Sequence, residues 1–166
     1  MASYKKLKPI ILKWEGGWSN DPNDSGGCTM KGVTIGTYRA YFGKSKTCSD
    51  LRKISDSQWD SIFIHKYWNK WSADAIKNQS IANLLVDWLW TSGVYGIKYP
   101  QRVLGVTDDG IVGPKTIAAI NNYPNQKELF QKLWNKRKKH FESIATGNKK
   151  KFLRGWLNRL NDFKFE

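Results

Sequence analysis

The chain has 166 residues, a formal net charge of +14, and 9 Trp, 7 Tyr and 7 Phe. This length suits one domain, or one domain with a small subdomain packed against it. The aromatic content argues against a disordered chain, no apolar stretch is long enough to span a membrane, and the 2 Cys and 2 His lack zinc-ligand spacing, so we expect no metal and no cofactor.

The first predicted helix ends at Glu15. Its apolar stripe has the three-four spacing of one helix face: Leu7, Ile10, Ile11 and Trp14. Gly16 and Gly17 then stop the helix, because glycine readily adopts the left-handed conformation of a helix end. A carboxylate in the last turn faces the negative end of the helix dipole, which favours the protonated acid that glycosidic bond cleavage requires. The simpler interpretation is a solvated, idle glutamate.

A polar segment, residues 18–36, follows this helix. It contains Pro22, six Ser, Asn or Asp residues and four glycines, which are residues that favour turns. We predict an ordered polar loop or a small β-hairpin, anchored by Trp18, Val33 and Ile35. The segment brings a second carboxylate and two hydroxyl groups into reach of Glu15.

The remainder of the chain reads as helices. Ser55 and Gln58 form a predicted capping box, and Ser80 is expected to cap the helix that ends at Gly93. Asp87 lies close to the apolar stripe of that helix and is expected to be a hydrogen-bonded structural acid.

Later helices are predicted from residue 99 to 104, from Pro114, over 126–145 and over 148–163. The turn at 109–114 has two interpretations. It is either a tight connection between helices or a cradle for wall peptide or glycan.

Residues 11–34, Ile-Leu-Lys-Trp-Glu-Gly-Gly-Trp-Ser-Asn-Asp-Pro-Asn-Asp-Ser-Gly-Gly-Cys-Thr-Met-Lys-Gly-Val-Thr, resemble the signature of the glycoside hydrolase family 108 muramidases. These are phage- and prophage-type peptidoglycan hydrolases, some of them described as secretion activators. Residues 64–68, 84–93 and 101–116 agree with this resemblance, and the last block resembles the peptidoglycan-binding half of the family. The resemblance covers roughly residues 8–145.

The resemblance implies a mainly α, lysozyme-like fold with a small polar loop or β-hairpin after the first helix. We expect a catalytic part over residues 1–92 and a helical, peptidoglycan-binding part over 93–166, packed as one compact unit. The implied reaction is that of an N-acetylmuramidase, which hydrolyses the β-1,4 bond between N-acetylmuramic acid and N-acetylglucosamine. The family's catalytic glutamate falls on Glu15.

Our hypothesis for the site has Glu15 as general acid. Asp24 would stabilise the oxocarbenium-like cation or orient water, assisted by the hydroxyl of Thr29 or Thr34. The expected substrate-binding residues are Trp18, Asn20, Trp88 and Tyr95. Retention or inversion at the anomeric carbon stays open. A lytic transglycosylase and a non-catalytic wall-binding or secretion-accessory protein are the alternatives.

The charge is uneven, with 13 Lys and Arg against 8 Asp and Glu in residues 1–90, and 15 against 6 in residues 91–166. Such a surface attracts polyanions, including the bacterial envelope, although it also reads as a solvated face. The basic runs lack interleaved aromatics and any reading motif, so nucleic acid is not an expected partner. Peptidoglycan is the expected partner of a monomer.

Two questions about processing follow from the sequence. Cys28 and Cys48 could form a disulfide worth about 3 kcal/mol or remain free thiols, and the sequence favours neither. The first residues lack a signal-peptide core, so we expect synthesis in the cytoplasm and action on the wall after export or lysis.

Overall fold

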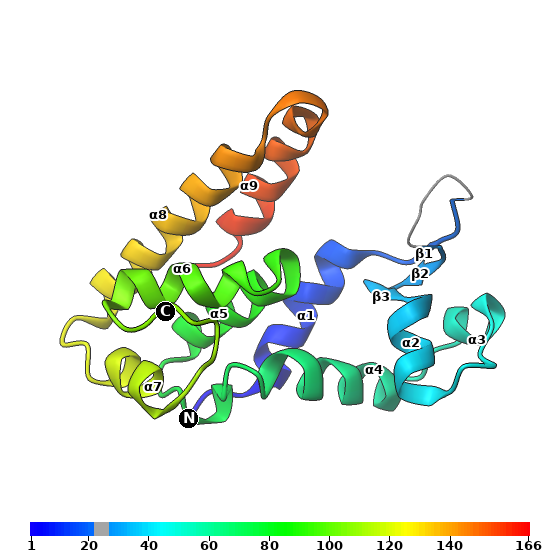
Figure 1. Cartoon of the computed structure of the whole chain (residues 1–166), viewed down its shortest axis with the longest axis horizontal. Coiled ribbons are helices and arrows are strands. Elements are labelled where there is room, and N and C mark those ends of the chain that lie inside the picture. Colours follow the sequence, from blue (N-terminus) through cyan, green and yellow to red (C-terminus); the bar gives the residue numbers. More distant parts are fainter. Residues whose placement is uncertain (22–26) are drawn as a thin grey trace. The chain divides into compact units, whose positions relative to one another are not determined.

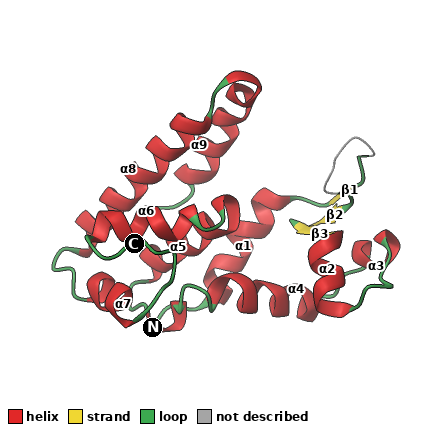
Figure 2. Cartoon of the chain, in the orientation of Figure 1, coloured by secondary structure: helices red, strands yellow, loops and turns green. Residues whose placement is uncertain are grey.

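The computed structural model describes residues 1–21 and 27–166, and most of these residues are helical (Figures 1 and 2). The chain divides into two compact units, which we call the hairpin unit (Lys8–Lys66) and the helical unit (Met1–Leu7 with Tyr67–Glu166). This division differs from the one expected after residue 92. The reason is that α5 (Gln79–Ser92) packs against α6 (Tyr95–Leu104) and α8 (Gln126–Ile144), which places it in the helical unit.

The hairpin unit holds a small sheet and short helices. Its elements are α1 (Tyr4–Glu15) from Lys8 onward, β1 (Trp18–Ser19), β2 (Thr29–Met30), β3 (Val33–Thr34), α2 (Ile35–Phe42), α3 (Cys48–Arg52) and α4 (Asp56–Phe63). The predicted end of the first helix at Glu15 and the predicted hairpin after it are confirmed.

The three strands form an antiparallel sheet in the order β1-β2-β3. Trp18 pairs with Met30, which in turn pairs with Val33. Paired residues of an antiparallel sheet point to the same face. Because Val33 is buried, this row faces the interior of the hairpin unit.

The core of the hairpin unit forms around α4. Ser55 and Gln58 make the predicted capping box, with each side chain bonded to the backbone of the other residue. The next residue, Trp59, has a buried indole that stacks on Phe63 and donates a hydrogen bond to the carbonyl of Lys31 at 3.0 Å. This bond ties the tip between β2 and β3 to the core.

The helical unit contains α5, α6, α7 (Pro114–Asn121), α8 and α9 (Leu153–Asn161), with short 3₁₀ turns at Ala73–Ala75 and Gly147–Phe152. One turn of π-helix (Ile64–Trp68) carries the chain out of the hairpin unit. Pro114 occupies the first turn of α7 as predicted. No helix in the described part of the chain is both long enough and apolar enough to span a membrane.

Three predicted helix boundaries are corrected. Asn78, not Ser80, caps α5, and the hydroxyl of Ser80 instead accepts a hydrogen bond from the backbone N–H of Glu166 at 3.0 Å. Helix α6 begins at Tyr95 rather than at Tyr99, so Pro100 lies inside it. The last predicted helix starts as the 3₁₀ turn and becomes α-helical at Leu153.

A buried ionic cluster joins α5 to α8 and α9. The carboxylate of Asp87 is fully buried and accepts hydrogen bonds from Nη2 of Arg137 at 2.7 Å and Nη2 of Arg159 at 2.7 Å. Burial lowers the pKa of Arg137, an effect that the charge of Asp87 opposes. Asp87 is therefore the structural acid that we expected. Helices α8 and α9 lie side by side (Figure 1).

Candidate active site

Glu15 is the last residue of α1, and its side chain is half-buried. The next residue, Gly16, has φ of +63°, a left-handed conformation that residues with a side chain rarely adopt. The chain thus turns sharply and enters β1 within three residues. This turn places Glu15 three residues before the first strand of the small sheet.

The second face of the sheet is a row of hydroxyl groups. Ser19 pairs with Thr29, and Thr29 pairs with Thr34. The hydroxyl of Thr34 accepts a hydrogen bond from the N–H of Thr37 at 3.2 Å, so it caps α2. The hydroxyl of Thr29 makes no hydrogen bond within residues 1–21 and 27–166. The structure therefore separates two threonines that the sequence left equivalent.

Trp18 and Asn20, the predicted substrate-binding residues of this region, differ in their exposure to solvent. The ring of Trp18 is half-buried, and the guanidinium of Arg52 lies 5.5 Å from its centroid. Asn20 is exposed at the end of β1. Asp24 falls outside the described residues.

A disulfide anchors the hairpin. Cys28 and Cys48 are bonded, with their Cα atoms 6.0 Å apart, which answers the question that the sequence left open. Cys28 directly precedes β2, and Cys48 is the first residue of α3. The bond therefore fastens the strand that carries Thr29 to a neighbouring helix.

Trp88 was predicted to bind substrate, but its side chain has no exposed surface. Its side chain is fully buried in the helical unit, where the indole N–H donates to Nδ1 of His140 at 3.3 Å. No face of this ring is open to a sugar. Burial, followed by the charges of Arg137 and Lys136, lowers the pKa of His140 below its usual 6.5.

Tyr95, by contrast, is 51% exposed at the start of α6. Its ring stacks on Tyr99, with centroids 5.7 Å apart, and Arg102 and Lys136 lie over the ring of Tyr99. The four side chains form a solvent-facing aromatic and cationic surface. A sugar could stack on such a surface through its apolar face.

The turn at residues 109–114 is organised by Gln101, which sequence reasoning missed. This buried amide donates to the carboxylate of Asp109 at 3.2 Å and to the carbonyl of Ile111 at 2.9 Å, and accepts from the N–H of Gly110 at 3.0 Å. A Cβ atom on Gly110 would lie 2.7 Å from a methyl group of Val94. These contacts support the interpretation of the turn as a tight connection between helices. A groove of about 690 Å³ runs along the turn.

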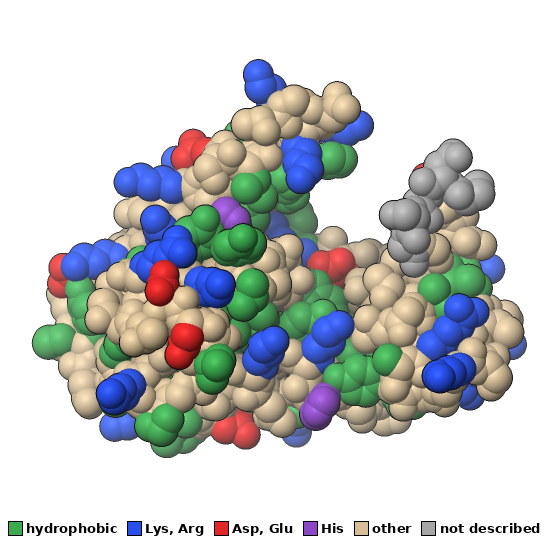
Figure 3. Space-filling model, in the orientation of Figure 1, with side chains coloured by type: hydrophobic (Ala, Val, Ile, Leu, Met, Phe, Trp, Pro, Cys, Tyr) green, Lys and Arg blue, Asp and Glu red, His purple; other side chains and the backbone are tan. Residues whose placement is uncertain are grey.

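Figure 3 shows many Lys and Arg side chains at the surface of the helical unit on the face in view. Among residues 1–21 and 27–166, no group of three or more His, Cys, Asp and Glu side chains could hold a metal ion.

Comparisons with known proteins identify the family of the chain. Residues 9–93 match the family model "Glycosyl hydrolase 108", and residues 95–161 match the model "Predicted Peptidoglycan domain". The chain is similar to a solved structure of SagA from Brucella abortus, with a TM-score of 0.82 and 27% identity over 96% of this chain and 90% of that one. A comparison with curated proteins gives no match. The chain therefore belongs to the glycosyl hydrolase 108 family, with a lysozyme-like fold and a role in hydrolysing cell-wall peptidoglycan.

Proposed function

We propose that the chain is an N-acetylmuramidase that hydrolyses the β-1,4 bond between N-acetylmuramic acid and N-acetylglucosamine, with Glu15 as general acid. One observation carries the proposal. Glu15 is half-buried at the end of α1, and Ser19, only four residues later, pairs with Thr29 on the hydroxyl face of the sheet. An acid at a helix end is therefore followed, four residues later, by a strand residue whose paired neighbours carry hydroxyl groups.

In the proposed reaction the protonated carboxyl of Glu15 donates its proton to the glycosidic oxygen. The bond from that oxygen to the anomeric carbon breaks, and the leaving sugar departs as an alcohol through an oxocarbenium-like transition state. Water then adds to the anomeric carbon, and its proton passes to a carboxylate.

Asp24 and Thr29 are the proposed partners of Glu15. Asp24 would stabilise the cationic sugar or orient the water, and Asp24→Asn should lower the rate by less than Glu15→Gln does. Thr29 is preferred over Thr34 because the Thr34 hydroxyl caps α2. Thr29→Val should therefore lower turnover with little loss of stability, whereas Thr34→Val should cost about 1 kcal/mol of stability through the lost cap. The reverse pattern would reassign the two hydroxyls.

Substrate binding is proposed to use Trp18 and Asn20 in the hairpin unit and Tyr95 in the helical unit. Each is at least partly exposed. Tyr95→Ala should weaken the binding of sacculi without changing the fold, because its ring is half in solvent. Unchanged binding would show that Tyr95 does not bind the glycan.

The decisive experiment is turnover of purified sacculi by wild type and Glu15→Gln. Loss of a general acid lowers the rate by about 10²- to 10⁴-fold, and we expect a loss in that range. The matched control is Glu142→Gln, which makes the same chemical change at an exposed position on α8 and should retain full activity. Equal turnover by wild type and Glu15→Gln would refute the assignment of Glu15 as the acid, whereas no turnover by the wild type would favour a non-catalytic wall-binding protein.

Analysis of the products tests the bond and the reaction type. Borohydride reduction of the released fragments should convert muramic acid, not glucosamine, to its sugar alcohol. Mass spectrometry should show that each cut adds one water. Fragments that instead end in an anhydro sugar would identify a lytic transglycosylase.

A further inference from the structure

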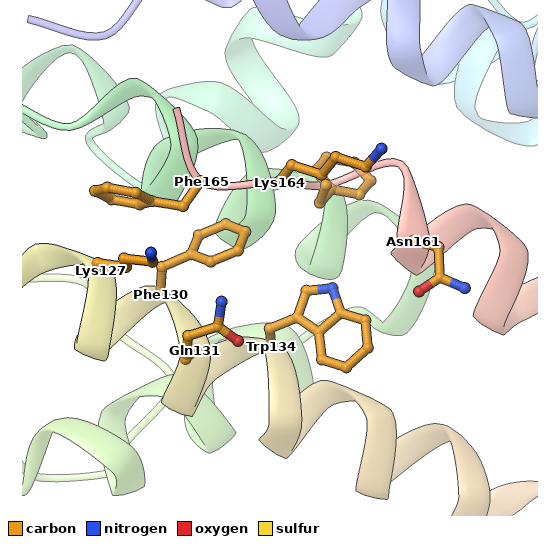
Figure 4. A pocket seen from close by; sticks show the side chains of 8 residues that line it. Lys127, Phe130, Gln131, Trp134, Asn161, Lys164 and Phe165 are labelled. Carbon is orange, nitrogen blue, oxygen red and sulfur yellow. The ribbon is translucent and has the colours of Figure 1, made fainter.

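A second pocket lies in the helical unit, between α8 and the segment that follows α9 (Figure 4). Its volume is about 310 Å³, at the small end of the range of ligand pockets, which suits a fragment the size of one or two sugar residues. One wall is a single face of α8, because Lys127, Gln131 and Trp134 are spaced by four and three residues. Figure 4 shows Lys164 and Phe165 on the opposite side.

The walls of this pocket are held in place without a ligand. The indole N–H of Trp134 donates to the carbonyl of Leu160 at 3.1 Å, which fixes the ring against the end of α9. Phe165 packs on Phe130 with ring centroids 5.8 Å apart. The next residue donates its N–H to Ser80, so the segment cannot swing away freely. A preformed pocket loses less conformational entropy when it binds.

The lining combines apolar rings with amide groups. Trp134 and Phe165 are partly exposed and offer ring faces to the apolar side of a sugar. Gln131 and Asn161 are exposed at the rim, and each amide both donates and accepts hydrogen bonds. This pairing of ring and amide matches an N-acetyl group, which has a methyl, an N–H donor and a carbonyl acceptor.

The charge of the lining points to an anion. Lys127 lies on the α8 wall and Lys164 on the other, and none of the described residues that line the pocket is acidic. Within the described part of the chain, neither ammonium group takes part in an ion pair. A ligand with a carboxylate would supply the missing partner.

We propose that this pocket binds an N-acetylated amino sugar that carries a carboxylate, the chemistry of a muramyl peptide. The inference rests on the proposed function only for the source of the ligand, since wall glycan with peptide stems supplies that chemistry. The pocket would hold a stem-bearing sugar on the helical unit, independently of the acid at Glu15.

The test uses the full-length Glu15→Gln protein, which avoids turnover, and muramyl dipeptide as the probe. Titration calorimetry gives the affinity, and NMR follows the indole N–H of Trp134 and the side-chain amides of Gln131 and Asn161. We expect these signals to shift, and N-acetylglucosamine alone or the dipeptide alone to bind at least about tenfold more weakly, a difference of about 1.4 kcal/mol. Equal binding of the sugar alone, or of the peptide alone, would overturn the proposal, as would shifts confined to other residues.

Variants test the two ammonium groups. Lys127→Ala combined with Lys164→Ala should raise the dissociation constant by about tenfold or more, and arginine at both positions should restore affinity. The matched control, Lys139→Ala with Lys149→Ala, removes two exposed lysines outside the pocket and should bind as wild type does. An alanine pair in the pocket that binds equally well would contradict the proposal.

The two proposals fail in different ways. Muramyl dipeptide binding without hydrolysis of sacculi by the wild type would defeat the muramidase assignment alone. Hydrolysis of sacculi without binding of the dipeptide would defeat the pocket assignment alone.

Discussion

Asp87→Asn should strongly destabilise the helical unit. The carboxylate of Asp87 has no solvent exposure and forms ion pairs with two guanidinium groups, those of Arg137 and Arg159. The amide of asparagine has almost the same shape, so the change removes charge with little change in volume. Breaking a buried ion pair on one side costs about 3–5 kcal/mol, a large part of the roughly 5–15 kcal/mol that stabilises a typical domain.

Urea denaturation followed by circular dichroism measures this loss. With a slope of about 2 kcal/mol per molar urea, the midpoint should fall by roughly 2 M. The control is Asp108→Asn, which breaks the exposed pair of Asp108 with Arg102 and should shift the midpoint far less. A midpoint within about 0.5 M of wild type for Asp87→Asn, corresponding to about 1 kcal/mol, would refute the reasoning.

Arg137→Met sharpens the same test. In the described part of the chain, Nε and Nη1 of Arg137 are buried without a hydrogen-bond partner, so the side chain carries a desolvation penalty that methionine would relieve. Asp87 would keep its two hydrogen bonds from Arg159, at 2.7 and 3.2 Å. We therefore expect Arg137→Met to destabilise less than Asp87→Asn. Equal losses would show that packing, not charge, dominates the cluster.

Three further predictions concern stability. The pKa of His140 is lowered in the folded chain, so the unfolded chain binds a proton near the usual pKa of 6.5, whereas the folded chain binds it only at lower pH. The free energy of unfolding should therefore fall as the pH drops below about 6.5, and His140→Gln should make this fall smaller. Parallel pH profiles of stability for the two proteins would contradict this. Reduction of the bond between Cys28 and Cys48, or replacement of both by alanine, should lower the free energy of unfolding by about 3 kcal/mol, read as a urea midpoint that moves with reductant in wild type only. Gly96→Ala should destabilise by about 1–3 kcal/mol, because its Cβ would lie 2.5 Å from the backbone of α5. Gly155→Ala, with open space around it, should stabilise by up to about 1 kcal/mol. A melting temperature that does not fall for Gly96→Ala, or that falls for Gly155→Ala, would contradict the corresponding expectation.

Features set by neighbouring residues were predictable from the sequence. Glu15 before two glycines, the capping box at Ser55 and the proline at position 114 each act within one turn of backbone, so the structure has them where the pattern indicated. The capping of α5 was mistaken because Asn78 and Ser80 can both cap a helix. What decides between them is the bond from Glu166 to Ser80, a contact 86 residues distant in sequence.

In the candidate site, too, the features that depend on contacts distant in sequence could not be predicted. A tryptophan at the spacing of an apolar stripe can be core or groove, and the burial of Trp88 depends on α8 passing over it to place His140 against its indole. Gln101 was missed for a similar reason, since a lone glutamine in a helix carries no signal. Its function follows from the turn that folds back onto it. The separate roles of Thr29 and Thr34 likewise became visible only once the strand register was known.

The small size of the hairpin unit explains why it contains a disulfide. Units below about 70–80 residues rarely bury enough apolar surface to be stable without a cross-link, and this unit is smaller than that. The loop that the bond closes, from Cys28 to Cys48, contains β2, β3 and α2, and therefore both Thr29 and Thr34. The same bond that limits the freedom of the unfolded chain also ties the start of β2, the strand that pairs with β1, to α3. In this small unit the stabilising cross-link and the proposed acid-bearing site thus depend on the same strands.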